Sequence, residues 1–336
     1  MHPVEQRTER KARVAICIAT YQRRELLRRL LAGISRLSFE RMPAPEILVV
    51  VVDNDVHRSA ADICDSVVLP WRAKYVLEPC RGIAQARNRA IREAEDSDFL
   101  AFIDDDEVPA PLWLDELLST QARFEADIVC GPVLPRFAPG VPEWAKAGSF
   151  FSKHIHSTGY AMETCCTGNV LISRKVISAV PAFDERFGLS GGEDTHFFLR
   201  ARRAGFQIIC ASGAIVYEDV PASRANLHWL LRRAYQTGNC WVLCESSLDR
   251  TLPTRIARIA KACGRILQGA ISLCVSPVFG TAAFVQALAK LFLGAGMIAA
   301  LAGRNFQAYR SRGMDAPKES KGRAHSWVED SPVKEA

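Results

Sequence analysis

Apolar residues in the first part of the chain form short continuous runs that alternate with stretches of helical spacing. The continuous runs predict strands that are buried on both faces of a sheet. They are Val14–Ala19, Ile47–Val52, Lys74–Leu77 and Phe99–Ile103. The intervening segments predict helices over Arg24–Leu37, Ile83–Glu95 and Leu112–Phe124. This alternation predicts an α/β fold with a doubly wound, mostly parallel sheet flanked by helices, whose ligands bind beyond the carboxyl ends of the strands.

The middle of the chain continues the pattern after one long interruption. Asp127–Leu134 predicts another strand, whereas Pro135–Tyr160 is rich in Pro, Gly and aromatic residues and follows no period. Long ordered loops of this kind are often lids or binding loops, so we expect this one to cover an acceptor site. The remaining predictions are a strand at Val170–Ser173, a helix at Asp194–Arg203, an extended segment at Gln207–Tyr217 and a helix at Asn226–Leu243.

The last quarter of the chain has a different pattern. Ile266–Ala289 carries no charged residue, and Leu291–Gly303 is uncharged again after Lys290. Pro277 and Gly280 interrupt the first run, which predicts a hydrophobic helical hairpin rather than one continuous crossing of a bilayer. The hairpin can re-enter a membrane or lie in its plane; the alternative is a soluble hairpin packed on the preceding domain.

Charge divides the chain at the same point. The whole sequence has 43 Lys and Arg against 37 Asp and Glu, and 12 of the basic residues and 5 of the acidic ones lie from position 251 onward. The last quarter therefore carries a net charge of +7 and the rest −1. This division argues against a nucleic-acid partner and favours a membrane surface, with the basic flanks on the cytoplasmic face of the inner membrane.

Four segments follow from these patterns. We expect a polar tail over 1–13 without a secretory signal, a catalytic domain over 14–250, a basic and hydrophobic membrane-associating region over 251–312, and a disordered tail over 313–336. The 11 cysteines contain no C-x-x-C spacing and no zinc-finger spacing with histidine. We interpret them as reduced structural thiols.

Acidic residues mark the predicted strand ends. Asp53 ends one strand, Asp104-Asp105-Asp106 ends another, and Glu193-Asp194 opens a helix after two glycines. Three crowded carboxylates repel one another unless a cation compensates them. If the segment is extended, Asp104 and Asp106 face the same way and can ligate Mg²⁺ or Mn²⁺, hard ions that take oxygen ligands and bridge phosphates. A solvated acidic turn is the alternative.

Basic residues lie at the same predicted edge. Thr20-Tyr21-Gln22-Arg23 follows the first strand, and Arg81 and Arg87 flank a glycine turn that leads into a helix. Arginine side chains beside a helix N-terminus suit an anion such as a diphosphate. No Walker loop and no G-x-G-x-x-G follows the first strand, which leaves P-loop and dinucleotide-binding proteins unsupported.

The ordered series T-Y-Q-R, V-V-D-N-D, R-G-I-A-Q-A-R-N, F-I-D-D-D-E and G-G-E-D-T-H-F-F-L-R resembles the inverting glycosyltransferases of family 2, which have the GT-A fold. The run R-R-A-Y-Q-T-G at 232–238 is most similar to bacterial exopolysaccharide β-glucosyltransferases of the succinoglycan type. The resemblance covers 14–238 and implies transfer of a sugar from a UDP-type donor to a hydroxyl of a glycan or lipid-linked saccharide.

The resemblance also implies residue roles. Asp104 and Asp106 would hold the metal, with Asp105 between them, and Asp194 with its neighbour Glu193 would supply the catalytic base. The donor would contact Thr20, Tyr21, Arg23, Asp53, Arg81, Arg87 and Asp105. A third metal ligand could come from His154, His156, His196 or His228, but we favour a solvated or hydrogen-bonded role for each. Gln22 stands where many members have Asn. The Q-x-x-R-W signature of processive polymerases is absent, which favours one sugar per encounter.

Two other functions fit part of the pattern. Asp104-x-Asp106-x-Val108 also matches the motif of haloacid-dehalogenase-like phosphatases, in which the pair follows the first core strand rather than a later one. A catalytically inert membrane protein that still binds a nucleotide is the second alternative. The three aspartates Asp104, Asp106 and Asp194 count against it.

Overall fold

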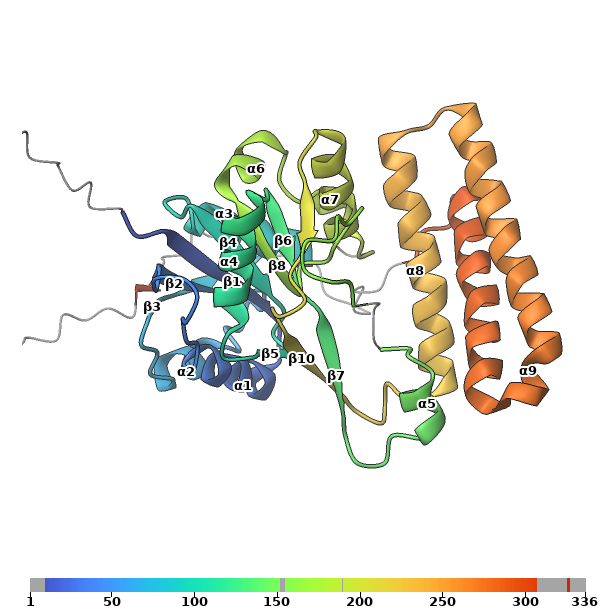
Figure 1. Cartoon of the computed structure of the whole chain (residues 1–336), viewed down its shortest axis with the longest axis horizontal. Helices are drawn as coiled ribbons and strands as arrows, with labels where there is room; N and C mark the ends of the chain where they lie inside the picture. The colour runs from blue at the N-terminus through green and yellow to red at the C-terminus, as the bar shows by residue number, and fades with distance from the viewer. Residues whose placement is uncertain (1–9, 152–154, 189, 307–324, 327–336) are drawn as a thin grey trace, which may run out of the picture.

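The computed structural model describes residues 10–151, 155–188, 190–306 and 325–326. It consists of an α/β domain and a bundle of long helices beside it (Figure 1). The strands are β1 Arg13–Thr20, β2 Glu46–Asp53, β3 Arg72–Leu77, β4 Phe99–Ile103, β5 Glu107–Pro109, β6 Ile128–Cys130, β7 Val133–Phe137, β8 Asn169–Ser173, β9 Ile208–Cys210, β10 Val216–Val220 and β11 His325–Ser326. The helices are α1 Arg24–Ile34, α2 Ala61–Ser66, α3 Ile83–Glu93, α4 Trp113–Phe124, α5 Glu143–Ala147, α6 Arg174–Ala179, α7 Glu193–Arg203, α8 Leu227–Leu248 and α9 Leu252–Leu301, with a 3-10 turn η1 at Glu185–Phe187.

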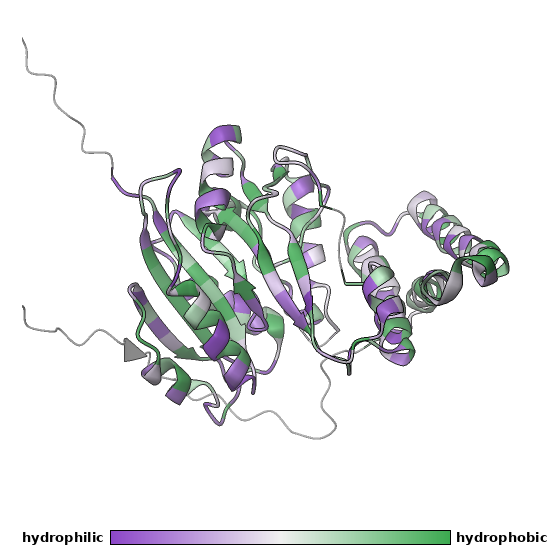
Figure 2. Cartoon of the chain, turned by 60° about the horizontal axis from the view of Figure 1, so that its bottom comes forward, coloured by the Kyte–Doolittle hydropathy of each residue, from purple (hydrophilic) through white to green (hydrophobic). Residues whose placement is uncertain are grey.

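The central sheet has the order β11-β3-β2-β1-β4-β8-β6-β9. Strands β1 to β4 are parallel, whereas β8 runs antiparallel to both β4 and β6. This confirms the predicted mixed, mostly parallel sheet. In β1, alternate side chains enter opposite cores: Ile16 faces α1, α2 and α4, and Cys17 faces α3, α6 and α7. Both faces are buried because helices cover them, as the continuous apolar runs predicted. Figure 2 shows the strands of this sheet as mainly hydrophobic.

Two predicted strands are each divided between two sheets. The segments Asp127–Leu134 and Gln207–Tyr217 were expected to be continuous, but β6 and β9 belong to the central sheet while β7 and β10 join β5 in a second sheet of order β5-β10-β7. The chain turns at Gly131, where a β-carbon would lie 2.0 Å from the Ala214 carbonyl oxygen. Only glycine permits so close an approach of the two segments.

The segment predicted as a long ordered loop, Pro135–Tyr160, contains regular structure. Its first residues form the end of β7, and α5 lies within it. Trp229 of α8 stacks on Phe151, and Gln286 of α9 donates a hydrogen bond to the Gly148 carbonyl oxygen at 2.9 Å. This connection therefore links the second sheet to the helical bundle.

Helix α9 is the predicted hairpin. At Gly280 the backbone leaves the helical region, with φ 82° and ψ −176°, so two arms meet there. The arms pack closely, since a β-carbon at Gly294 would lie 2.6 Å from the Ile266 side chain. Helix α8 packs against both arms (Figure 1). Among the described helices, α9 alone is long and apolar enough to cross a membrane. Of the tail expected to be disordered, the structure describes 325 and 326, which pair with β3.

Candidate active site

The predicted acidic and basic residues gather at the carboxyl edge of the parallel strands. Thr20 ends β1 and is in register with Asp53 at the end of β2. Strand β4 pairs with β1 on the other side, and Asp104 follows its last residue. This is the edge at which doubly wound sheets bind ligands.

The three aspartates form a tight turn rather than the extended segment that we expected. The Glu107 amide donates to the Asp104 carbonyl oxygen at 3.1 Å, which closes the turn. Asp104 and Asp106 are nevertheless partly exposed, while Asp105 between them is buried. Asp105 accepts hydrogen bonds from the Thr20 hydroxyl and from Arg23, both at 2.8 Å. It therefore ties the turn to the end of β1 instead of facing a ligand.

Arg87 connects Asp104, one of the two predicted metal ligands, to Glu193, the neighbour of the predicted base. It lies on α3 and is buried; its Nη2 is 2.9 Å from Asp104, and its Nη1 pairs with Glu193. Glu193 and Asp194 begin α7 after Gly192, whose φ of 95° suits glycine. Arg87, which we expected near the donor phosphates, thus holds the two acidic segments together.

The electrostatics of the site favour a cation. Desolvation raises the pKa of Asp104 although its side chain is partly exposed, Arg87 opposes this shift, and the charges of Asp106 and Asp194 raise the pKa further. Burial likewise raises the pKa of Glu193 to about 7, with Arg87 opposing and Asp194 adding to the rise. The pKa of Glu107 is raised well above its usual value by burial and by Asp104. Carboxylates that raise one another's pKa in this way are stabilised when a divalent ion binds among them.

Asp104 and Asp106 are the residues that fit a metal ion. Asp104 is 43% exposed, and Asp106 also contacts Arg23 and Arg224 at 3.2 and 3.1 Å. Within the described ranges no group of three or more His, Cys, Asp and Glu side chains is arranged to hold a metal. The two aspartates would therefore need oxygen atoms of a diphosphate or of water to complete the shell.

The histidines do not join this pair. His196 is buried on α7 against Phe187, and His156 stacks on Tyr160. His228 is exposed on the first turn of α8. His154 lies outside the described residues. Each described histidine is thus better explained by packing or solvation than by metal binding.

The basic side of the edge is built around Arg81. Its guanidinium lies over the Tyr21 ring, 3.0 Å from the centroid, and its buried Nη1 has no hydrogen-bond partner in the described part of the chain. The Asn54 side chain accepts a hydrogen bond from the Gly82 amide at 2.8 Å and fixes the turn beside it. A buried donor without a partner is costly, so this one fits an anionic or polar ligand.

Asp53 is placed differently from its neighbours. It is fully buried, and its oxygens accept hydrogen bonds from the Asp55 and Ala60 amides and from the Tyr75 hydroxyl. The geometry makes it a support for the loop after β2; a bound donor would have to share these oxygens.

Comparison with known proteins assigns the fold and the family. The model of Glycosyl transferase family 2 matches residues 15–180, and that of Glycosyl transferase family group 2 matches 99–302. The succinoglycan biosynthesis protein ExoM of Rhizobium meliloti (strain 1021) is 36% identical over 231 residues, which cover 67% of this chain and 72% of the relative. The chain belongs to glycosyl transferase family 2. It is a glycosyltransferase, and the phosphatase alternative finds no support.

One further curated relative agrees with this family assignment, and one solved structure shares the fold. Glycosyltransferase AglE of Haloferax volcanii is 25% identical over 244 residues, covering 70% of this chain and 77% of AglE. Among solved structures, the mannosyltransferase PcManGT from Pyrobaculum calidifontis in complex with GDP-Man and Mn²⁺ has a TM-score of 0.56 at 18% identity, covering 88% of each chain. This second likeness concerns the fold, and it supports the GT-A architecture.

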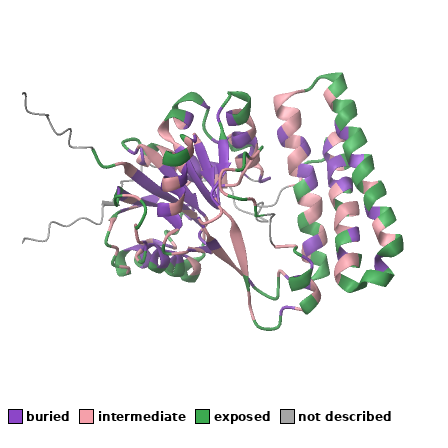
Figure 3. Ribbon diagram, viewed as in Figure 1, coloured by how far each residue is buried: buried purple, intermediate pink, exposed green. Residues whose placement is uncertain are grey.

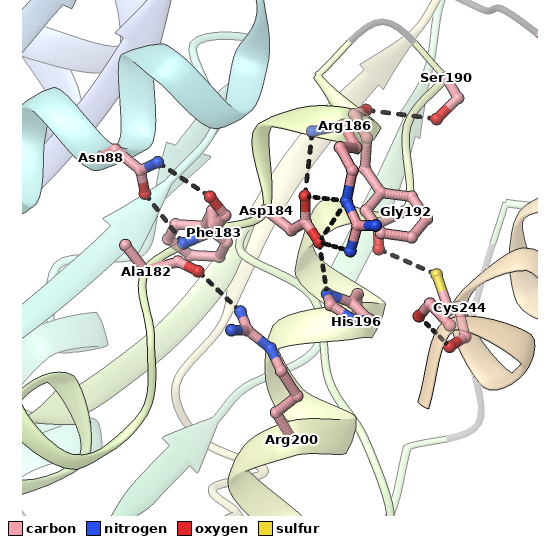
Figure 4. Close-up of polar contacts among 12 residues, drawn as sticks. Asn88, Ala182, Phe183, Asp184, Arg186, Ser190, Gly192, His196, Arg200 and Cys244 are labelled. Atoms are coloured by element: carbon pink, nitrogen blue, oxygen red, sulfur yellow. Dashed lines mark hydrogen bonds and ion pairs between the residues drawn. The ribbon is translucent and has the colours of Figure 1, made fainter. Parts of the chain in front are cut away.

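In this glycosyltransferase, the segment before the proposed base is fixed by polar contacts that sequence patterns did not indicate (Figure 4). Asn88 of α3 exchanges two hydrogen bonds of 2.9 Å with the Phe183 backbone. Asp184 holds Arg186, and Cys244 of α8 donates to the Gly192 carbonyl oxygen at 3.1 Å. The turn that presents Glu193 and Asp194 is therefore held by both the α/β domain and the helical bundle.

Three residues of the glycosyltransferase site escaped the sequence prediction. Glu107 accepts a hydrogen bond from the Asp104 amide at 3.1 Å. Arg224 bridges Asp106 and Glu218, at 3.1 and 2.7 Å, from the turn after β10. Glu107 had a local signal in the motif F-I-D-D-D-E, whereas Arg224 and Glu218 reach the site only through the second sheet.

Proposed function

We propose that this glycosyltransferase moves a sugar from a nucleoside-diphosphate donor, of the UDP type, to a hydroxyl of a glycan or lipid-linked saccharide, with inversion at the anomeric carbon. The observation that carries this proposal is the pair Asp104 and Asp106 beside the Glu193–Asp194 helix start, joined by Arg87. The two candidate metal ligands and the candidate base belong to one cluster of interacting charges, which supports the proposal.

Asp104 and Asp106 would hold a Mg²⁺ or Mn²⁺ ion against the diphosphate. Such an ion, when bound, supplies Lewis-acid stabilisation of the leaving group. Asp194 would take the proton of the acceptor hydroxyl as it attacks the face opposite the leaving nucleotide. Direct displacement inverts the configuration, so an α-linked donor gives a β-linked product. Glu193 is the buried partner of Arg87 and positions Asp194 rather than replacing it.

The donor would bind along the ends of β1 and β2. The Tyr21 ring with the stacked Arg81 offers an aromatic and cationic surface, and the unpartnered Nη1 of Arg81 offers a donor to it. Thr20 and Arg23 act through Asp105, which sets the position of the metal-binding turn. The GDP-Man and Mn²⁺ bound in the structural relative support a nucleoside-diphosphate donor and a divalent ion.

The acceptor and the cellular location are supported by other features of the chain. The segment Pro135–Tyr160 connects the second sheet to the bundle and would cover the acceptor. The succinoglycan relative favours polysaccharide biosynthesis. The basic and apolar C-terminal region would keep the enzyme at the cytoplasmic face of the inner membrane, near a membrane-bound acceptor.

A donor screen tests the proposal. UDP- and GDP-sugars are incubated with the enzyme and Mn²⁺ or Mg²⁺, with and without a membrane lipid extract, and nucleotide release is measured. We expect release from one class of donor and more of it with the extract, and the proton NMR coupling of the new linkage should show inversion. Retention of configuration would overturn the mechanism. Donor binding without nucleotide release under every condition would favour the catalytically inert alternative. Release of phosphate from simple phosphoesters would favour the phosphatase alternative.

A further inference from the structure

A cavity of about 620 Å³ lies behind the turn that carries the proposed base. Phe187 and Ser190 form one wall, the end of α8 forms another, and both ends of α9 close it. Its apolar surface comes from Phe187, Leu243 and Leu301. No residue proposed for donor binding or catalysis lines it, so the cavity is separate from the candidate active site.

The cavity carries positive charge that the protein does not neutralise. Four arginines line it, and none of its described lining residues is Asp or Glu. Arg186 is paired with Asp184, and Arg258 with Glu245. Arg250 and Arg255 are exposed and have no ion pair in the part of the chain that the structure describes. Exposed guanidinium groups that form no ion pair within these ranges are well suited to a phosphate.

An apolar surface begins beside these arginines. Leu252 and Ile259, three residues before and four residues after Arg255, are 68% and 41% exposed. The same face of the first arm continues through Leu267, Ile271 and Val278, all exposed. Eleven of the sixteen large apolar side chains that are exposed in the described residues belong to α9. Figure 3 shows this outer arm exposed along most of its length.

This arm is suited to lie on a bilayer rather than to cross it. The turn at Gly280 divides the uncharged run 266–289 into two pieces, each shorter than the ~20 residues that a spanning helix needs. The exposed charged residues of the arm lie outside the apolar face. Arg255 borders this face, and Lys261 and Arg265 lie on the opposite face of the helix. A helix with an apolar face and basic residues beside it binds in the plane of an anionic membrane.

We propose that the cavity is a binding site for the phosphate group of an anionic membrane phospholipid, held by Arg250 and Arg255, while the adjacent apolar face of α9 enters the acyl region. The proposal rests on the proposed membrane location but not on the transfer chemistry. Because the turn before the proposed base forms one wall of the cavity, an occupied site places the active site at the lipid surface.

Vesicle binding by the full-length enzyme tests this site. Partitioning is measured by co-sedimentation with phosphatidylcholine vesicles that contain or lack phosphatidylglycerol. We expect Arg250→Gln with Arg255→Gln to weaken binding to the anionic vesicles by roughly 10- to 30-fold, since each arginine near such a surface contributes about fivefold. Exposed Ile256 and Ile259, changed to serine, should weaken binding to both kinds of vesicle.

The matched control removes the same charge elsewhere. Arg36 and Arg72 are exposed in the α/β domain, and Arg36→Gln with Arg72→Gln should leave vesicle binding within a few-fold of wild type. If the control and the cavity variant lost vesicle binding equally, a specific site would be overturned. The same conclusion would follow if the cavity variant bound vesicles as tightly as wild type. Saturable binding of inorganic phosphate or glycerol phosphate without vesicle binding would also overturn the lipid assignment.

Two further readouts separate this proposal from its rivals. Nucleotide release in the absence of vesicles should be unchanged in the cavity variant, so loss of lipid binding is distinguishable from failure of the proposed chemistry. If a second copy covered the apolar face, the serine variant would convert a dimer to a monomer in analytical ultracentrifugation. That result would overturn membrane docking.

Discussion

Asp194 is the residue whose loss we expect to slow transfer most while leaving donor binding intact. Its Oδ1 accepts the Thr195 amide at 2.6 Å, which orients the carboxylate at the start of α7. Asp194→Asn keeps this shape but removes the base, so kcat should fall by roughly 10²–10⁴-fold with little change in donor affinity. Steady-state nucleotide release and donor titration measure the two quantities. An unchanged kcat would exclude Asp194 as the base.

Arg87 permits a test of the bridge between metal and base. Arg87→Lys keeps the charge but replaces a fork that contacts Asp104 and Glu193 by a single ammonium group. Loss of one charge-assisted hydrogen bond corresponds to about 10- to 100-fold in kcat/KM. Arg89→Lys on the same helix is the control, because Arg89 pairs with Glu93 instead. Equal activity of both variants would show that the bridge has no catalytic importance.

His196 makes a prediction about stability and pH. Burial lowers the pKa of His196 to about 4. Between about pH 6.5 and pH 4, this side chain is therefore protonated in the unfolded chain but neutral in the folded one. Its contribution to stability is present above that window and is lost as the pH falls through it. Relative to His196→Phe, wild type should lose on the order of 3 kcal/mol across this range. Urea unfolding of both proteins at several pH values measures the difference; parallel pH curves would contradict it.

Which residues the sequence could reveal depended on how they reach the site. Asp104, Asp106 and Asp194 follow strands or begin helices, so their place in the pattern located them at the ligand-binding edge. Arg224 contacts Asp106 across 118 positions of sequence, and no local pattern records such a contact. The bridge that Arg87 forms between two carboxylates could not be predicted either. An arginine on a helix near an anion site has the same sequence pattern as an arginine that pairs with two acidic residues.

At the scale of elements, apolar runs located strands well wherever the chain stayed in one sheet. Strand β4 has the predicted bounds, and β1 and β2 differ from theirs only at their ends. The prediction failed at Gly131, where the apolar pattern continues although the chain passes from one sheet to the other. The apolar pattern indicates that a residue is buried but not in which sheet its strand lies. The division of this segment between two sheets could therefore not be predicted.

The contact between α8 and α9 depends on two glycines. A β-carbon at Gly296 would lie 2.0 Å from the Tyr235 carbonyl oxygen, and one at Gly238 equally close to that of Leu293. Gly296→Ala should therefore force the helices apart and cost about 1–3 kcal/mol of stability. Gly264→Ala is the control, since nothing lies within 4 Å of its added methyl group. Thermal unfolding compares them; equal melting temperatures would show that this close contact is not needed.

At the scale of the whole molecule, the helical bundle and the catalytic edge are parts of one arrangement. Cys240 and Cys244 of α8 donate hydrogen bonds to the carbonyl oxygens of Ser190 and Gly192, directly before the proposed base. The bundle that carries the hairpin thus also supports the catalytic turn. The hairpin itself was predicted from charge and apolar runs, but this contact was not, because it joins segments that are 50 residues apart.

Metal removal tests the central claim most directly: a divalent cation between Asp104 and Asp106 stabilises the departing nucleoside diphosphate. Nucleotide release is measured on chelator-treated enzyme with the donor that the screen identifies, before and after Mn²⁺ or Mg²⁺ is returned. We expect release to fall to the background rate after chelation and to recover with either ion. Recovery should be absent in the Asp104→Asn, Asp106→Asn double variant. Undiminished turnover by the metal-free enzyme would contradict the claim.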